Sequence, residues 1–287
     1  MKVMLVCNPR SGRRQAPEVR HRAEEMAAAA GIALHVRMIE GPGHGTVLAQ
    51  EGVEQGYDRV IGVGGDGTFN ALAAGLMGSK VALGLVPMGS GNGYARSVGV
   101  PLKPEAALHR ALTGPIRRMD MGYLNDRPFL GVAGIGFDAQ VAHRFAESRG
   151  RGLWNYVRIT LEEMADAAAM SVQVRANGLD LREEVLMVVC CNTREFGNGA
   201  VISPNSRPND GQAELLLVRR PGWLPMIGAM AKLFTGGLQE SRLVHLLTTT
   251  QARIVQPGTW AHVDGEPFTV GPTVEFRLES GCLWVAA

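Results

Sequence analysis

Short apolar runs alternate with mixed polar and apolar stretches through about the first 120 residues of the chain. Runs typical of strands lie at 1–6, 33–38, 59–63 and 81–86. Stretches with helical periodicity lie at 17–30, 46–55, 69–76 and 104–112. Regular alternation of strands and helices is typical of a parallel sheet that has helices on both faces. The pattern therefore predicts an α/β domain built from repeated strand–helix units.

The pattern changes near residue 120, and short strands dominate the rest of the chain. They are expected at 171–176, 179–183, 185–191, 213–218, 243–255 and 273–278. Asn177-Gly178 lies between the first two and supplies the positive φ angles of a tight hairpin turn. Helices are expected at about 152–168 and 222–234. This half predicts an antiparallel sheet or sandwich, with the domains divided as 1–122 and 123–287.

A glycine-rich stretch, Val60–Asn70, carries the strongest functional signal. An apolar strand ends there in Gly64-Gly65-Asp66-Gly67-Thr68, and a helical pattern follows. A loop between a strand and a helix presents backbone N–H groups and a helix N-terminus to an anion. Asp66 is unusual in such a loop because a carboxylate repels a phosphate unless a cation lies between them. The loop therefore predicts a nucleotide phosphate bound together with a divalent metal.

Other interpretations of this loop fit less well. Gly62-x-Gly64-x-x-Gly67 matches the dinucleotide fingerprint, but the next strand ends in Pro87-Met88, without the acid that would hold a ribose hydroxyl. A Walker loop would need Gly-Lys-Ser/Thr after the glycines. A plain tight turn needs only one or two glycines, fewer than this loop contains.

Two further loops follow strands of the same predicted sheet. Pro87–Gly93 follows the strand at 81–86, and Cys7–Gly12 follows the strand at the start of the chain. The carboxyl ends of neighbouring parallel strands lie at one sheet edge, where open α/β sheets bind ligands. The three loops together predict a nucleotide cradle.

Three motifs, taken together, resemble the diacylglycerol kinase catalytic-domain family. They are Asn8-Pro9-x-Ser11-Gly12, Gly64-Gly65-Asp66-Gly67-Thr68 and Pro87-x-Gly89-Ser90-Gly91-Asn92. The family includes soluble bacterial diacylglycerol kinases, related bacterial lipid kinases, and sphingosine and ceramide kinases. Later family motifs match in order at Gly134–Ala139, Ser203–Gly211 and Val263–Glu266. NAD kinases share the Gly-Gly-Asp-Gly-Thr motif, so the ordered set is what favours the lipid-kinase branch.

The resemblance implies a fold and a reaction. The fold would be a Rossmann-like α/β domain of the NAD kinase and diacylglycerol kinase type, followed by a mainly antiparallel β-sandwich domain. The reaction would be ATP-dependent transfer of the γ-phosphate to a hydroxyl of a lipid such as diacylglycerol, in the cleft between the domains.

The resemblance also implies roles for residues. Asp66 would organise the catalytic magnesium, and Glu266 would act as general base with Asp264 beside it. Asp138 would contact the acceptor head group. Asp210 would hold a structural magnesium with backbone oxygens of Arg207 and Gln212. The nucleotide-binding residues would be Asn8, Ser11, Gly64, Gly65, Gly67, Thr68, Ser90 and Asn92.

The chain departs from the family pattern at two acidic positions. Gly93 stands where the second loop usually has Asp, and Asn209 stands where relatives often have an acid before Asp210. Two alternatives therefore stay open: an NAD kinase-like enzyme that phosphorylates a soluble nucleotide, and a non-catalytic regulator that binds nucleotide or lipid. Local sequence alone also permits Val263–Glu266 to be only a hairpin turn.

Bulk properties limit the partners. A composition of 46% hydrophobic and 20% charged residues is ordinary for a globular protein, and a net charge of +2 creates no general demand for nucleic acid. Arginines at 144, 149, 151 and 158 surround Trp154 and Tyr156, a mixture that suits an anionic lipid surface or a solvated helix face equally well. The apolar helix near 223–234 fits a buried helix or a membrane-docking element.

The remaining signals concern location. The four cysteines form no Cys-x-x-Cys pair, which is typical of reduced thiols in a cytoplasmic protein. No apolar run reaches the roughly 20 residues needed to span a bilayer. We therefore expect a cytoplasmic protein that reaches a membrane lipid from the inner surface. The sequence leaves a homodimer open, and the seven histidines show no metal-binding spacing and are expected to be structural.

Overall fold

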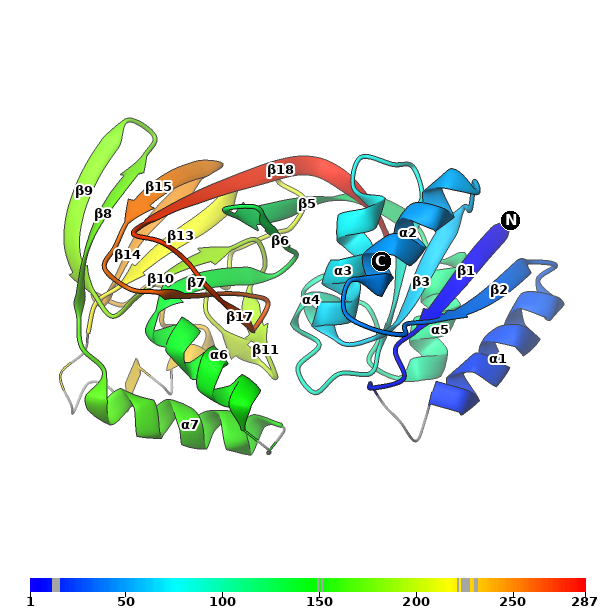
Figure 1. Cartoon of the computed structure of the whole chain (residues 1–287), viewed down its shortest axis with the longest axis horizontal. Helices are drawn as coiled ribbons and strands as arrows, with labels where there is room; N and C mark the ends of the chain where they lie inside the picture. Colours follow the sequence, from blue (N-terminus) through cyan, green and yellow to red (C-terminus); the bar gives the residue numbers. More distant parts are fainter. Residues whose placement is uncertain (12–15, 149, 151, 221, 223–227, 230–231) are drawn as a thin grey trace. The chain divides into compact units, whose positions relative to one another are not determined.

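The computed structural model describes residues 1–11, 16–148, 150, 152–220, 222, 228–229 and 232–287. Its chain folds into two compact units (Figure 1). The first contains Met1–Met119 together with Gly281–Ala287, and the second contains Asp120–Ser280. The last residues join the first unit because the end of a long C-terminal strand pairs with its sheet.

The first unit is built on a parallel sheet in the order β2-β1-β3-β4-β18. Its strands are β1 (Lys2–Cys7), β2 (Ala33–Met38), β3 (Arg59–Gly64), β4 (Ala82–Pro87) and the end of β18 (Thr273–Ala286). The α/β prediction is confirmed, since the four strands expected from apolar runs are present and every residue of β3 and β4 is buried.

Helices cover this sheet from both sides. They are α1 (Ala16–Ala29), α2 (His44–Glu54), α3 (Asp66–Leu76), α4 (Gly93–Ser97) and α5 (Pro104–Thr113). Helix α2 packs against α3, and α1 packs against α5. Right-handed crossovers place these two pairs on opposite faces of the sheet. Helix α3 begins at Asp66, three residues before the start expected from periodicity.

The second unit contains two mainly antiparallel sheets. One has the order β14-β13-β10-β7-β16-β17, and the other contains β18, β15, β8 and β9, with β5 beside β18 and β6 beside β5. The strands are β5 (Ile116–Leu124), β6 (Arg127–Phe129), β7 (Val132–Gly136), β8 (Met170–Ala176), β9 (Leu179–Val185), β10 (Met187–Cys191), β13 (Ala213–Val218), β14 (Val244–Thr249), β15 (Gln251–Val255), β16 (Trp260–Val263) and β17 (Glu266–Thr269). A short separate hairpin joins β11 (Glu195–Gly197) to β12 (Ala200–Val201).

One apolar core lies between the two sheets. Ile135 and Leu215 enter it from the first sheet, and Val174, Ile254 and Phe276 enter it from the second. The predicted β-sandwich is confirmed. The hairpin at Asn177-Gly178 is confirmed as well, because both residues have positive φ, 52° and 77°.

Several sequence-based boundaries were wrong. The stretch 243–255 forms two strands, β14 and β15, which belong to different sheets and meet at Thr250. The strand expected at 273–278 continues to Ala286. Helix α6 (Phe137–Glu147) was not expected, whereas α7 (Leu153–Asp166) matches the helix expected at about 152–168. The helix expected at 222–234 lies largely outside the described residues.

The described residues include no helix long and apolar enough to cross a membrane. All four cysteines are free thiols. Cys7, Cys190 and Cys191 are buried, and burial raises the pKa of the Cys7 thiol to about 11, as expected for an unreactive core thiol.

Candidate functional site

The predicted glycine loops lie together at one edge of the first unit's sheet. Strands β3 and β4 are parallel neighbours whose last paired residues are Gly64 and Pro87. Just beyond them, the Met88 N–H donates a hydrogen bond to the Gly64 carbonyl at 2.7 Å. The third loop joins the same edge, because the Asn8 N–H donates to the Val63 carbonyl at 3.0 Å. The expected shared edge is therefore present.

Close backbone packing explains why two of these positions are glycine. A Cβ atom on Gly89 would lie 2.8 Å from the Gly65 Cα atom, and a Cβ atom on Gly64 would lie 2.4 Å from the Thr68 Oγ1 atom. Both distances are shorter than Cβ contacts in real proteins. The two loops can approach each other only without a side chain at Gly89, and Gly64 leaves room for Thr68 of its own loop.

Asn8 ties the first loop to helix α3. Its Nδ2 group donates to the Thr68 Oγ1 atom at 2.9 Å, and its Oδ1 atom accepts the Arg10 N–H at 3.0 Å. Ser11 bonds back to the Asn8 carbonyl through its N–H at 3.1 Å. Gly12, the last residue of this motif, lies outside the described residues. Asn8 thus orients a threonine at the start of α3.

Asp66 has partners within the protein. It occupies the first turn of α3, and its carboxylate accepts the N–H groups of Gly93 and Tyr94, each at 3.2 Å. These N–H groups lie at the start of α4. Burial raises the pKa of Asp66, and the Tyr94 and Gly93 amides oppose part of that rise. Backbone amides therefore compensate part of this charge, and the expectation that a cation lies between Asp66 and a phosphate stays a prediction.

The second loop is closed by its own asparagine. Asn92 has a φ of 50°, accepts the Gly89 N–H at 2.9 Å and donates to the Gly89 carbonyl at 2.8 Å. Ser90 is exposed at the tip. Gly93, which replaces the family's usual Asp, contributes a backbone donor to Asp66 instead of a carboxylate. Asn92 therefore shapes the loop that presents Ser90.

The loop edge suits a phosphate ligand. Within the described part of the chain, no side chain caps the N-terminus of α3, and the Thr68 and Phe69 N–H groups donate to the Gly65 carbonyl at 2.9 and 3.1 Å. A ligand would therefore meet the N–H groups that precede Thr68. Glycines keep side chains away from these groups. Magnesium commonly binds proteins through one or two carboxylates together with substrate phosphates, and Asp66 could supply one carboxylate.

In the second unit, the Asp264-Gly265 turn joins β16 to β17. Both residues have positive φ, 49° and 82°, so the hairpin interpretation is confirmed. The Asp264 carboxylate accepts three consecutive N–H groups, from Leu130 at 2.9 Å, Gly131 at 2.8 Å and Val132 at 3.1 Å. Asp264 thereby anchors the turn to the segment that leads into β7.

Glu266 follows directly after this turn and is exposed. Desolvation by the surrounding protein nevertheless raises the pKa of Glu266, and the nearby positive charge of Arg127 opposes the rise. A general base works best when its pKa lies near the operating pH, so a raised carboxyl pKa suits that role.

Asp138 lies in the first turn of α6 and is buried. Its Oδ1 atom accepts the Ala139 N–H at 2.9 Å, and its Oδ2 atom lies 3.1 Å from the Nε2 atom of His262. His262 is also buried, so the expectation that this carboxylate needs a partner is met by a histidine. Sequence reasoning missed this pairing because the two residues are 124 positions apart.

The predicted structural metal site is a polar loop. The Asp210 Oδ1 atom accepts the Gln212 N–H at 3.0 Å, and the buried Asp120 accepts the Gly211 N–H at 2.8 Å. Burial raises the pKa of the neighbouring Glu214. No three His, Cys, Asp or Glu side chains of the described residues are grouped to hold a metal. The site at Asp210, with the Arg207 and Gln212 carbonyls, stays a prediction.

The basic surface near α7 is only partly described. Trp154 is 86% exposed, whereas Tyr156 is half-buried. Arg144 pairs with Glu163 at 2.8 Å, and Arg158 pairs with Glu162 at 2.6 Å, so acids offset both charges. The arginines at 149 and 151 lie outside the described residues. The anionic-lipid interpretation stays a prediction.

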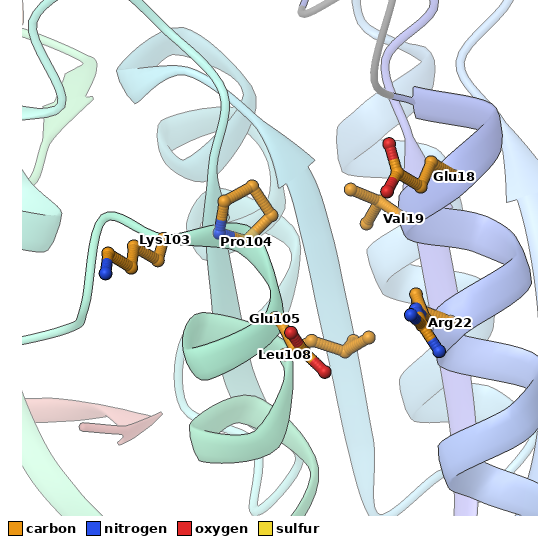
Figure 2. Close-up of a pocket in the computed structure, with 7 residues that line it drawn as sticks. All are labelled: Glu18, Val19, Arg22, Lys103, Pro104, Glu105 and Leu108. Atoms are coloured by element: carbon orange, nitrogen blue, oxygen red, sulfur yellow. The ribbon is translucent and has the colours of Figure 1, made fainter.

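A cavity of about 330 Å³ lies between α1 and α5 of the first unit (Figure 2). It is lined by Glu18, Val19, Arg22, Lys103, Pro104, Glu105 and Leu108. Two acids and two bases surround its apolar side chains, and none of its lining residues belongs to the predicted site. The glycine loops, not this cavity, carry the phosphate-binding features.

Comparisons with known proteins agree with this architecture. Residues 2–124 match the diacylglycerol kinase catalytic domain, and residues 131–287 match the YegS C-terminal NAD kinase beta sandwich-like domain. The chain is 32% identical over 268 residues to a "Probable lipid kinase YegS-like" of Pseudomonas fluorescens, a match covering 92% of this chain and 88% of that protein. It is 28% identical over 277 residues to a "Diacylglycerol kinase" of Mycobacterium tuberculosis, again covering 92% and 88%.

A solved structure supports the fold. A crystal structure described as a diacylglycerol kinase from Bacillus anthracis superimposes with a TM-score of 0.78 at 20% identity, covering 99% of this chain and 96% of that one. The two domain matches, the relatives and the ordered glycine loops lead to one conclusion: this chain belongs to the diacylglycerol kinase family of YegS-like lipid kinases.

Proposed function

We propose that the protein is a magnesium- and ATP-dependent lipid kinase that transfers the γ-phosphate of ATP to a hydroxyl group of a lipid such as diacylglycerol. The observation that carries this proposal is the pair of glycine loops at the ends of β3 and β4, next to the uncapped N-terminus of α3. Membership of a kinase family supports the use of ATP.

In this proposal the first unit holds the nucleotide. Phosphoryl transfer depends mainly on positioning and charge stabilisation, which backbone N–H groups at a helix N-terminus provide. Gly65 and Gly67 expose the backbone to the phosphates, and Asn8 orients Thr68 toward the same edge. Ser90 and Ser11 line the nucleotide site. When bound, magnesium supplies positive charge to the phosphate oxygens, and Asp66 is the residue that would hold it.

Glu266 accepts the proton of the lipid hydroxyl in this proposal. Its raised pKa fits a base, and general-base catalysis contributes about 10²- to 10⁴-fold in rate. Asp264 holds the turn that bears Glu266 through its three amide bonds. Transfer then requires the nucleotide loops of one unit and the acidic turn of the other to act in one cleft.

The lipid would be reached from the surface of the membrane, at its cytoplasmic face, and nucleic acid would not be a partner. Product formation would place the enzyme in phospholipid synthesis. Which lipid alcohol is accepted depends on the shape of the acceptor site rather than on any motif.

Mass spectrometry of a total lipid extract tests this proposal. The extract is incubated with the protein, ATP and magnesium, and parallel reactions contain NAD in place of lipid. We expect the wild type to form phosphorylated lipid and no phosphorylated NAD. Asp66→Ala and Glu266→Ala should form neither product. Phosphorylated NAD would favour the NAD kinase alternative. Tight lipid binding without any transfer would refute the proposal and favour a regulator.

A further inference from the structure

A continuous set of hydrogen bonds joins the start of α6 to the turn that bears Glu266. Asp138 contacts the ring of His262 at Nε2, 3.1 Å away, and the Gly265 N–H donates to Nδ1 of the same ring at 3.3 Å. Gly265 immediately precedes Glu266. The buried acid is thereby connected to the acidic turn through one imidazole ring.

The geometry fixes the protonation of the histidine. A backbone N–H can only donate, so Nδ1 must accept and carries no proton. The ring must then carry its proton on Nε2 in order to donate to the carboxylate of Asp138. Asp138 is the negative partner, placed in the first turn of α6, where a helix stabilises negative charge.

The surrounding strands restrict the conformations of the Asp138 and His262 side chains. His262 on β16 lies directly opposite Gly134 on β7 in the antiparallel register. A Cβ atom on Gly134 would lie 1.8 Å from the Asp138 Oδ2 atom, so the carboxylate occupies the space that the missing side chain leaves. The side chains of Asp138 and His262 are 4% and 3% exposed. Both are therefore held in one arrangement by packing.

The turn is held on two sides. Asp264 anchors it to the N–H groups of Leu130, Gly131 and Val132, and His262 holds Gly265. We propose that Asp138 and His262 form a positioning pair that fixes the turn bearing Glu266. In this role Asp138 acts through His262 and does not touch the lipid head group. The inference rests on the proposed function, because it concerns the position of the proposed base.

An amide at position 138 gives a sharp test. Asp138 accepts from Ala139 and from His262, but an asparagine has one acceptor oxygen and an NH₂ group in place of the second. If the oxygen stays with Ala139, the NH₂ group faces Nε2, and the ring then carries its proton on Nδ1 and loses the Gly265 contact. Asp138→Asn therefore alters the ring without changing the size of the side chain.

A second variant removes the acceptor directly. In His262→Gln the side-chain NH₂ group can still reach Asp138, but no atom replaces Nδ1 as acceptor for Gly265. His245→Gln is the matched control, because His245 pairs with Glu183 in the same unit on other strands. We expect Asp138→Asn and His262→Gln each to lower kcat about 10- to 100-fold, since displacement of a reacting group by about 1 Å can lower a rate 10²-fold. The KM values for ATP and lipid should stay within twofold, and the control should match wild type.

The kinetic constants of these variants distinguish a positioning role of Asp138 from direct contact with the lipid head group. A raised lipid KM with normal kcat in Asp138→Asn would assign Asp138 to the head group and overturn the proposal. Normal values in His262→Gln, or an equal loss in His245→Gln, would also overturn it. If Asp138→Asn does not fold, His262→Gln carries the kinetic test.

Nitrogen NMR of the wild-type full chain provides a readout that does not depend on activity. We expect His262 to carry its proton on Nε2, and hydrogen exchange at Gly265 to speed up in His262→Gln. A proton on Nδ1 in wild type would overturn the proposal. Absence of lipid phosphorylation by wild type would instead refute the proposed function, and the NMR result would still decide whether the contact exists.

Discussion

Replacing Asp264 with asparagine tests how strongly the acidic turn is anchored. The carboxylate accepts two N–H groups at Oδ1, from Gly131 and Val132, and one at Oδ2, from Leu130. An asparagine can keep the two bonds at its oxygen, but its NH₂ group would face the Leu130 N–H. One charge-assisted bond is lost, and two become neutral ones.

The magnitude follows from these bonds. A hydrogen bond to a charged group contributes about 1.5–3 kcal/mol, and a neutral one about 1 kcal/mol. Losing one bond and weakening two lowers the free energy of unfolding by roughly 2.5–7 kcal/mol, and the half-exposed position of Asp264 favours the lower part of this range, about 3 kcal/mol. For a unit of this size, 1 kcal/mol corresponds to about 2–4 °C, so the unfolding temperature should fall by about 6–12 °C.

Differential scanning calorimetry is the suitable assay because it can separate the transitions of the two units. Asp126→Asn is the matched control, an exposed Asp in the turn between β5 and β6 of the same unit. Asp126→Asn should change the free energy of unfolding by no more than about 0.5 kcal/mol. If Asp264→Asn unfolds within 1 °C of wild type, the three amide bonds do not stabilise the turn and our reasoning is wrong.

Three further predictions concern activity and binding. Asp66→Ala should abolish phosphate transfer, measured with radiolabelled ATP, and turnover near the wild-type rate would contradict the assigned role. The same variant should lower the free energy of unfolding by about 1 kcal/mol, because α4 loses its carboxylate partner. In the pH profile of kcat, activity should fall on acidification with an apparent pKa above the ordinary glutamate value, because Glu266 must be deprotonated to accept a proton and its pKa is raised. This acidic limb should disappear from the residual activity of Glu266→Gln. An unchanged limb in that variant would exclude Glu266 as the base. Gly89→Ala should weaken ATP binding, measured by calorimetry, at least tenfold, since its Cβ atom would lie 2.8 Å from the Gly65 Cα atom. Gly41→Ala should bind ATP normally, because a Cβ atom at Gly41 would meet open space. Equal affinities of the two variants would show that the close contact between the loops is not needed.

Elements that depend on local signals were predictable from the sequence. The strands at 33–38 and 213–218 have the expected bounds. The strand at 213–218 is buried throughout, as its largely apolar sequence indicates, whereas the strand at 33–38 is partly exposed. The Asn177-Gly178 hairpin followed from the need for positive φ. The two glycine loops were placed at a common edge because parallel topology brings strand ends together.

Features that depend on distant partners were not predictable. The break at Thr250 separates two strands that are equally apolar in sequence but pair in different sheets. The N–H groups that donate to Asp66 belong to Gly93 and Tyr94, which are 27 and 28 residues away. The local sequence does not indicate that the N–H groups of a helix will bind this side chain. The Asp138–His262 contact required knowledge of α6 and of the register between β7 and β16.

The end of β18 has a practical consequence for work with fragments. Residues Trp284–Ala286 pair with Ala82–Gly84, and the Ala287 N–H donates to the Pro115 carbonyl. A recombinant piece that stops near residue 124, where the catalytic-domain match ends, would lack this strand and leave β4 as a bare sheet edge. Such edges recruit strands from other molecules, so the piece should aggregate. Joining residues 281–287 to its end through a flexible glycine-serine linker should restore a soluble domain.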